Sequence, residues 1–266
     1  MLLRLARPAR LSRPLLQLAA RQFASSSSSA SASASSTASS ASYSPPAAEV
    51  RLKELQRRVA ACYAEGELEE GVAAGAEAYV LARAEFGATH PATASAANNL
   101  ALVQKASGDV EQATMHYTIA LDAYVGSVGE HHASTAKAAI NLAALLRQEG
   151  RIDEAEAMYR RALSSQDEAV GAEHVDTLAT ASALGTLLVG LGRIEEAEGL
   201  LRRVLSGREL ALGGEHPRTR AAATNLVLIL EAQGAGRAGE AASLRERHSL
   251  PAAPAAAESG ERGFSG

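Results

Sequence analysis

The feature that most constrains the fold is a repeat of 42 residues that runs through most of the chain. Five columns keep this interval through four successive copies, and a single residue type occupies each column. The columns are His90, His132, His174 and His216; Thr93, Thr135, Thr177 and Thr219; Gly87, Gly129, Gly171 and Gly213; Gly108, Gly150, Gly192 and Gly234; and Leu100, Leu142, Leu184 and Leu226. A fixed period of this length indicates stacked copies of one supersecondary unit.

Each copy predicts two helices. The first helix begins near Pro91 or Pro217, because proline at the first helical position loses no hydrogen bond that it would have made. It ends at the glycine of the Gly108 column, and the second helix follows at once and ends at the glycine of the Gly129 column. Acidic residues such as Glu195 complement the dipole at the start of the second helix. Each helix is then about 16 residues, or about 24 Å, long.

The residues between these signals predict close helix packing. Apolar residues make up 47% of the chain but aromatic residues only 3%, so the apolar share is mostly Ala, Leu and Val, which suit helices better than strands. Alanine at 113, 155 and 197 lets the second helix approach the first, and Tyr117 and Tyr159 fill the space one turn later. The sequence therefore predicts an all-α fold, a right-handed superhelical solenoid of antiparallel helix pairs.

The repeat also sets the expected domain boundaries. A degenerate helix pair and four copies are expected to form one solenoid at 49–249, and its last helix, at about 238–248, is short and charged, as terminal caps commonly are. The tail at 250–266 is rich in Ala, Pro and Gly and is expected to be disordered. The successive pairs are expected at 49–86, 87–128, 129–170, 171–212 and 213–249.

The N-terminal residues have a different composition. Residues 1–23 contain five arginines among Leu and Ala, and the first acidic residue of the chain is Glu49, which is typical of an organelle transit peptide. Residues 24–48 are mostly Ser and Ala and are expected to be a disordered linker. We expect a mitochondrial (matrix) location, with a plastid, or the cytoplasm for a protein with a basic N-terminus, as alternatives.

Charge and composition exclude several functions. The net charge of −4 becomes −9 when the five arginines of residues 1–23 are subtracted, and so acidic a body argues against general nucleic-acid binding. No stretch reaches the roughly 18–20 apolar residues of a membrane-spanning helix, so no integral membrane segment is expected. The single cysteine, Cys62, cannot form an internal disulfide and is expected to be a small buried residue.

The repeated histidines do not predict a metal site or a catalytic site. One per repeat places them about 10 Å apart, whereas a metal–imidazole bond is only about 2 Å long. A role at the joints between helices, or as helix caps, explains them better. The sequence also lacks a phosphate-binding glycine loop and a Gly-x-Ser-x-Gly elbow. We therefore expect a protein that is not an enzyme, without catalytic residues, metal ligands or cofactors.

The repeat resembles the tetratricopeptide repeat (TPR) family over about residues 87–249. The resemblance rests on the spacing of Leu100, Ala101, Gly108, Ala113, Tyr117 and Ala120, which matches the TPR framework and returns 42 residues later. TPR units usually run about 34 residues. The longer period, with Gly-x-x-His-Pro joints and NNLA or NLA in the first helix, is similar to the kinesin light chain subgroup. The resemblance implies a solenoid that binds other proteins.

One polar column suggests where a partner binds. Asn99, Asn141 and Asn225 share one register, and Ala183 interrupts it. The TPR resemblance implies that this first-helix position faces a concave groove. Asparagine there can pair with the backbone of an extended peptide whatever its side chains are. Hydrogen bonding between the helices, without a ligand, is the alternative for this column.

Three basic residues lie near this column. Lys137 is four residues before Asn141, so the two share a helix face. This pair is similar to half of the clamp by which some TPR cochaperones hold a C-terminal carboxylate, but alanine occupies the equivalent positions 179, 183 and 221. Arg147 and Lys105, further along the same helices, are expected either to line the groove or to be solvated.

These observations lead to one functional hypothesis and two alternatives. The hypothesis is a protein-binding or peptide-binding scaffold, an adaptor or assembly factor, that acts in an organelle. The first alternative is a permanent structural subunit of a large organelle complex. The second is a cytosolic cargo adaptor similar to kinesin light chains, although the residues before Glu49 lack the heptad segment that would join a motor.

Overall fold

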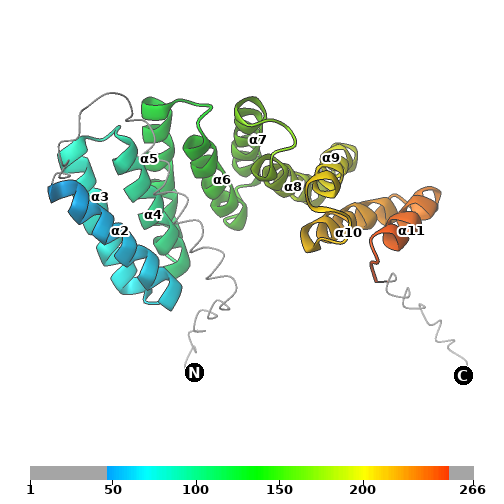
Figure 1. Cartoon of the computed structure of the whole chain (residues 1–266), viewed down its shortest axis with the longest axis horizontal. Coiled ribbons are helices and arrows are strands. Elements are labelled where there is room, and N and C mark those ends of the chain that lie inside the picture. Colours follow the sequence, from blue (N-terminus) through cyan, green and yellow to red (C-terminus); the bar gives the residue numbers. More distant parts are fainter. Residues whose placement is uncertain (1–46, 252–266) are drawn as a thin grey trace, which may run out of the picture. The chain divides into compact units, whose positions relative to one another are not determined.

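A computed structural model describes residues 47–251, and the transit peptide, nearly all of the linker and most of the tail predicted above lie outside them. The regular elements in this range are all helices, as the repeat predicts (Figure 1). They fall into two compact units that divide between Ala172 and Glu173. The first unit contains α2 (Ala47–Glu65), α3 (Leu68–Phe86), α4 (Pro91–Ser107), α5 (Val110–Val128), α6 (Ala133–Gln148) and α7 (Ile152–Ala169). The second contains α8 (Val175–Gly190), α9 (Ile194–Leu212), α10 (Pro217–Ala232), the 3₁₀ turn η2 (Ala235–Arg237) and α11 (Ala238–Arg247).

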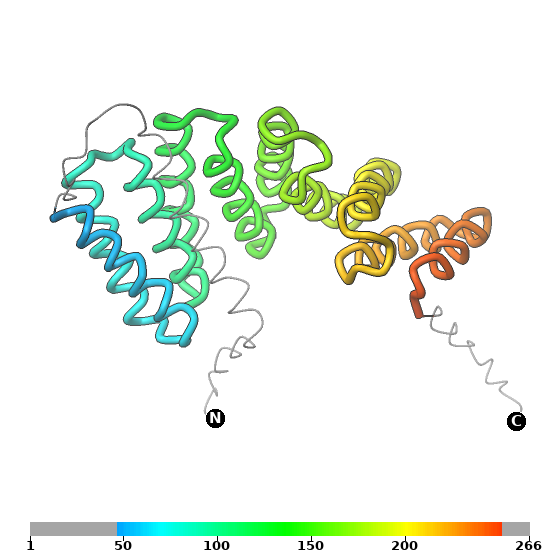
Figure 2. The backbone as a smooth tube through the Cα atoms, viewed as in Figure 1, coloured from blue at the N-terminus to red at the C-terminus, as the bar shows by residue number. Residues whose placement is uncertain are grey.

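Consecutive helices form packed pairs within each unit (Figure 2). α4 and α10 begin at Pro91 and Pro217, as the sequence predicts. The glycine that follows α4, Gly108, has φ +91° and ψ +4°, the left-handed conformation that closes a helix and that side chains with a Cβ rarely adopt. The short charged helix expected near the C-terminus is α11.

Each joint between two pairs is built from the repeated glycine, histidine and threonine. At the second joint, Gly129 has φ +92° and ψ +169°, a region that glycine occupies almost alone. His132 is the N-cap of α6, and its Nδ1 accepts a hydrogen bond from the Ser134 N–H at 3.1 Å. The Thr135 hydroxyl donates to the Gly129 carbonyl at 2.7 Å. His90, His174 and His216 cap α4, α8 and α10 in the same way, which confirms the predicted cap role.

The core of the first unit depends on a close approach of α3 to α4. A Cβ added to Gly75 would lie 3.1 Å from Leu100 Cδ1 and 3.3 Å from its Cα, so the missing side chain lets the helices touch at their backbones. One turn earlier, Gly71 meets Val103 in the same manner. Gly75 stands 42 residues before Tyr117, so the degenerate first pair has glycine where later pairs have a large side chain.

The second unit has its own core of leucine and alanine. Leu184, Leu201, Leu226 and Leu230 are fully buried there. A Cβ on Gly207 of α9 would lie 2.7 Å from Leu178 Cδ1, so α8 and α9 also meet closely. Each unit thus buries its own aliphatic core between consecutive helices, as stacked repeats require.

Candidate peptide-binding face

The asparagine column belongs to a surface that we call the first-helix face. It comprises three positions on each first helix, at spacings of four and then three residues, so the three side chains lie on one side of the helix. The positions are Ser95, Asn99 and Leu102 on α4; Lys137, Asn141 and Ala144 on α6; Ala179, Ala183 and Thr186 on α8; and Ala221, Asn225 and Leu228 on α10.

The exposure of this face changes along the chain. On α4 all three residues are buried, with Asn99 only 3% and Leu102 only 9% exposed. On α6 all three are half-buried. On α8 and α10 most of the positions are exposed, and Leu228 is 57% exposed although it shares a column with Leu102. A partner can therefore reach this face directly on α8 and α10.

Asn141 is held by a neighbour that the sequence analysis missed. Its Nδ2 donates a hydrogen bond to Asn98 Oδ1 at 3.0 Å, which joins α6 to α4. Asn98 is buried and lies one residue before the asparagine column, so the 42-residue register gave no signal for the contact. Isoleucine, serine and threonine occupy the equivalent positions in the later repeats. At Asn141 the structure contains the interhelical hydrogen bond that was the alternative to ligand binding.

The other two asparagines differ from Asn141. Asn99 is buried and its Oδ1 has no hydrogen-bond partner, which is uncommon for a buried amide. Asn225 is half-buried on α10, beside the exposed Leu228 and Thr224. The structure thus brings Asn99 and Asn141 to adjacent helices of the first unit, and of the three side chains only Asn141 has its interhelical bond.

The basic residues expected to line the groove all lie in the first unit. Lys137 is half-buried and has a polar partner. Burial lowers the pKa of Lys105, and the positive charge of Arg147 lowers it further, so these two cations lie near one another. Arg147 is exposed and its guanidinium hydrogen-bonds Tyr159, although burial dominates and raises the pKa of that phenol. Lys105 and Arg147 therefore form a positive region at the C-terminal ends of α4 and α6.

The second unit has no equivalent positive region at these positions. The residues in the Lys105 column are Val189 on α8, which is exposed, and Glu231 on α10. Arg245 donates to both carboxylate oxygens of Glu231, at 2.9 and 3.0 Å, so that charge is compensated. The first-helix face itself carries no charged residue on α8 or α10.

One group of possible metal ligands occurs in the described residues. The ligand atoms of Cys62, Glu67 and Glu70 all lie within 4.8 Å of one another. Burial raises the pKa of the Cys62 thiol, which keeps it protonated, and Arg58 already forms an ion pair with Glu70. A metal needs the thiolate form, so these residues fit an ion pair beside a buried thiol better than a metal site.

Comparison with known proteins identifies the repeat. The sequence profile of the tetratricopeptide repeat matches residues 54–124, 98–167 and 134–209, which together span more than half of the chain. The chain belongs to the tetratricopeptide repeat family. A comparison with curated protein sequences gave no match. No helix of this TPR protein within residues 47–251 has the length and apolar character needed to cross a membrane.

Solved structures with TPR-like repeats share the fold. The nearly identical TPR-like repeats assigned to a kinesin light chain of Podosopora anserina align with a TM-score of 0.63 and 21% identity, covering 76% of this chain and 92% of theirs. BtubC (BKLC) from P. vanneervenii aligns with a TM-score of 0.62 and 18% identity, covering 80% and 97%. The quorum sensor NprR of B. thuringiensis aligns at 0.56 and 15%, covering 89% and 60%. At these identities the likeness establishes the fold alone.

The family and the fold support a general role. TPR repeats form scaffolds that bind proteins or peptides, and the fold is typically non-catalytic. The kinesin light chain-like character expected from the 42-residue period agrees with two of these structures.

Proposed function

We propose that this chain is a non-catalytic adaptor or assembly factor that acts in an organelle, the mitochondrion, and holds a protein partner on its first-helix face. One observation carries the proposal: the face is open, uncharged and partly apolar on α8 and α10, with Leu228 more than half exposed. Other faces of these helices are buried in the core or carry charged side chains. An exposed leucine beside small residues gives a partner apolar area to bury.

Asn225 adds hydrogen-bonding capacity to this face. Its amide has two donors and one acceptor, it is half-buried, and it lies one helical turn before Leu228. An extended peptide that crosses α10 can bury a side chain against Leu228 while its backbone pairs with Asn225. Asn141 is already occupied by Asn98, so we assign a larger share of peptide recognition to Asn225 than to Asn141.

The test compares two exposed leucines. Leu228→Asp places a charge on the first-helix face, and Leu210→Asp places the same charge on α9, away from it. Both side chains are well exposed, at 57% and 82%, so neither change disturbs the core. Tagged full-length wild type and both variants are crosslinked in cells and captured, and the captured proteins are quantified by mass spectrometry.

The expected result is that Leu228→Asp loses specific partners that Leu210→Asp retains. Equal retention by both variants would overturn a role for the first-helix face. If all three proteins instead co-purify with one large complex in fixed proportion, the chain is a permanent structural subunit. Adding Asn225→Ala separately measures the contribution of the amide, and circular dichroism of each purified variant checks that it is folded.

The organelle part of the proposal rests on the composition of residues 1–23, where five arginines occur without an acidic residue. We expect a full-length fusion to a C-terminal fluorescent protein to co-localise with a mitochondrial marker. The captured protein should begin near residue 24 after processing. Replacement of the five arginines by glutamine should leave the fusion in the cytoplasm. Co-localisation of the unchanged fusion with a plastid marker, or a cytoplasmic signal, would contradict the mitochondrial assignment.

A further inference from the structure

The helix α11 differs from the other second helices in how it is held. It has ten residues, and only Ala241 and Leu244 are buried. For comparison, α9 buries Leu201, Val204 and Leu205 together with Ala197 and Gly207. A helix of this length is not stable alone in water, so α11 depends on its docking contacts. Two buried side chains provide a small apolar contribution, and polar contacts must provide the rest.

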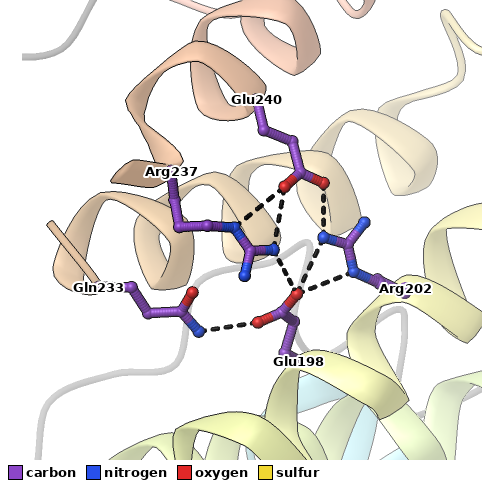
Figure 3. Close-up of polar contacts among 5 residues, drawn as sticks. All are labelled: Glu198, Arg202, Gln233, Arg237 and Glu240. Carbon is purple, nitrogen blue, oxygen red and sulfur yellow. Dashed lines mark hydrogen bonds and ion pairs between the residues drawn. The ribbon is translucent and has the colours of Figure 1, made fainter. Parts of the chain in front are cut away.

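A network of charged side chains holds the N-terminal end of α11 (Figure 3). Glu198 of α9 accepts hydrogen bonds from Arg237 and Gln233, both at 2.7 Å, and lies 2.9 Å from Arg202. Glu240 of α11 lies 2.9 Å from Arg237 and also accepts from Arg202. Arg202 and Arg237 thus each bridge the two carboxylates, and α11 is tied to α9 through charge.

Polar contacts also hold the C-terminal end. Arg245 pairs with Glu231 of α10, and Arg220 donates to the Ser249 carbonyl at 2.8 Å. His248 is fully buried, with Nδ1 3.2 Å from the Gly214 carbonyl and Nε2 3.0 Å from a Glu209 carboxylate oxygen. The segment after α11 is therefore anchored by a buried ring, whereas α11 itself is held mainly by ion pairs.

We propose that α11 is an electrostatically held cap, which loosens selectively when ionic strength rises while the rest of the second unit stays folded. The screening length falls from about 10 Å at 0.1 M salt to about 3 Å at 1 M, so salt weakens partly exposed ion pairs and leaves apolar burial intact. The four charged side chains of the network are all partly exposed. Loosening of α11 uncovers the side of α10 on which it packs, and His248 retains the chain end.

Hydrogen–deuterium exchange of the full-length chain at 50 mM and 1 M NaCl tests this proposal. We expect the amides of residues 241–247 to exchange about tenfold faster at 1 M, with α6 and α9 changing less than about twofold. Glu240→Gln should raise the exchange of α11 already at 50 mM and reduce its dependence on salt. Glu154→Gln, which breaks the exposed pair with Arg151 inside α7, is the matched control and should leave α11 unchanged.

Two results would overturn the proposal. One is exchange of α11 in the wild type at 1 M NaCl that stays within about twofold of its value at 50 mM. The other is a loss of protection in α9 and α10 that parallels the loss in α11, because the cap would then not be a separate element. The salt series needs no substitution, so it remains decisive if Glu240→Gln fails to fold.

Discussion

The two units use the same repeat but differ in what their first helices expose and in what holds them. In the first unit, α4 is buried on its first-helix face as well as on its core side, and α3 meets it at the backbone through Gly71 and Gly75. In the second unit, α10 exposes Leu228, and its neighbour α11 is held by charge. The repeat therefore fixes where a residue lies on its helix, while the neighbouring elements decide whether that position is covered, open or ionic.

The largest expected effect comes from filling the close contact in the first unit. Gly75→Val should lower the free energy of unfolding by about 2–3 kcal/mol, because a side chain at this position meets the backbone and side chain of Leu100. Urea unfolding followed by circular dichroism measures the loss. Gly199→Val in α9, where a Cβ meets nothing within 4 Å, is the control and should stay within about 0.5 kcal/mol of wild type. Equal losses in the two variants would remove the packing difference between the units.

A smaller effect should appear in the second unit on acidification. Hydrogen bonds from Gln233, Arg237 and Arg202 hold the pKa of Glu198 at about 2, below its ordinary value of 4.5. The folded carboxylate therefore binds a proton less readily than the unfolded one, so its stabilisation is complete above pH 4.5 and is lost as the pH falls toward 2. Allowing for solvent screening, we expect a loss of about 1–2 kcal/mol.

The acid effect is measured as the difference between wild type and Glu198→Gln in urea unfolding at pH 6, 4 and 2.5. The variant cannot gain the carboxylate term, so the gap between the two proteins should close as the pH falls. A gap that is constant from pH 6 to pH 2.5 would show that the network does not depress this pKa. Exchange data at the same pH values locate any loss in α9 to α11.

A gain of about 1 kcal/mol is expected from removing a buried polar group in the first unit. Gln104 is buried, its Oε1 has no hydrogen-bond partner, and leucine occupies this column at 146, 188 and 230. Gln104→Leu should raise the free energy of unfolding, because an unsatisfied buried amide is replaced by apolar contact. The reciprocal change Leu146→Gln should destabilise the same unit. A loss of stability in Gln104→Leu would indicate that the amide serves a purpose the contacts do not reveal.

The smallest effect should be the same in both units. His132→Ala and His216→Ala each remove the Nδ1 acceptor of an N-cap and should lower stability by about 0.5–1 kcal/mol. His132→Asn keeps a side-chain acceptor and should recover most of the loss. Thermal unfolding of the three variants measures this. A clear difference between His132→Ala and His216→Ala would mean that the joints also differ between the units.

The features that the sequence predicted well depend on residues close together in the chain. Helix starts at Pro91 and Pro217 and the histidine caps follow from dihedral preferences and hydrogen bonds within a few residues, and the glycine columns repeat them. The asparagine column was placed on the expected helices, but its environments were not foreseen. Asn99 is buried, Asn141 bonds to Asn98, and Asn225 is half-exposed.

What the sequence did not predict depends on contacts between elements. The bond between Asn98 and Asn141 joins residues 43 apart, so it does not follow the 42-residue columns. The charge network requires η2, which the two-residue insertion after Gly234 creates and which brings Arg237 to Glu198. Charged residues on a short terminal helix were expected, but sequence spacing could not pair them across three helices. Exposure of Leu228 and burial of Leu102 differ in the same way, since one column contains both.

The joint that repeats Gly, His and Thr has a consequence for how such a chain can change its length. Each joint closes within seven residues, from Gly129 to Thr135, with the glycine in a backbone conformation denied to other residues and with the cap and the threonine bond made locally. Removal of one whole period, such as residues 129–170, would fuse Val128 to Gly171 and leave an intact joint at the seam. Loss or gain of any other number of residues would split a joint. Duplication and deletion in steps of 42 are therefore the changes in length that this architecture tolerates most easily, and the side chains that meet across the new seam would then be the part left to adapt.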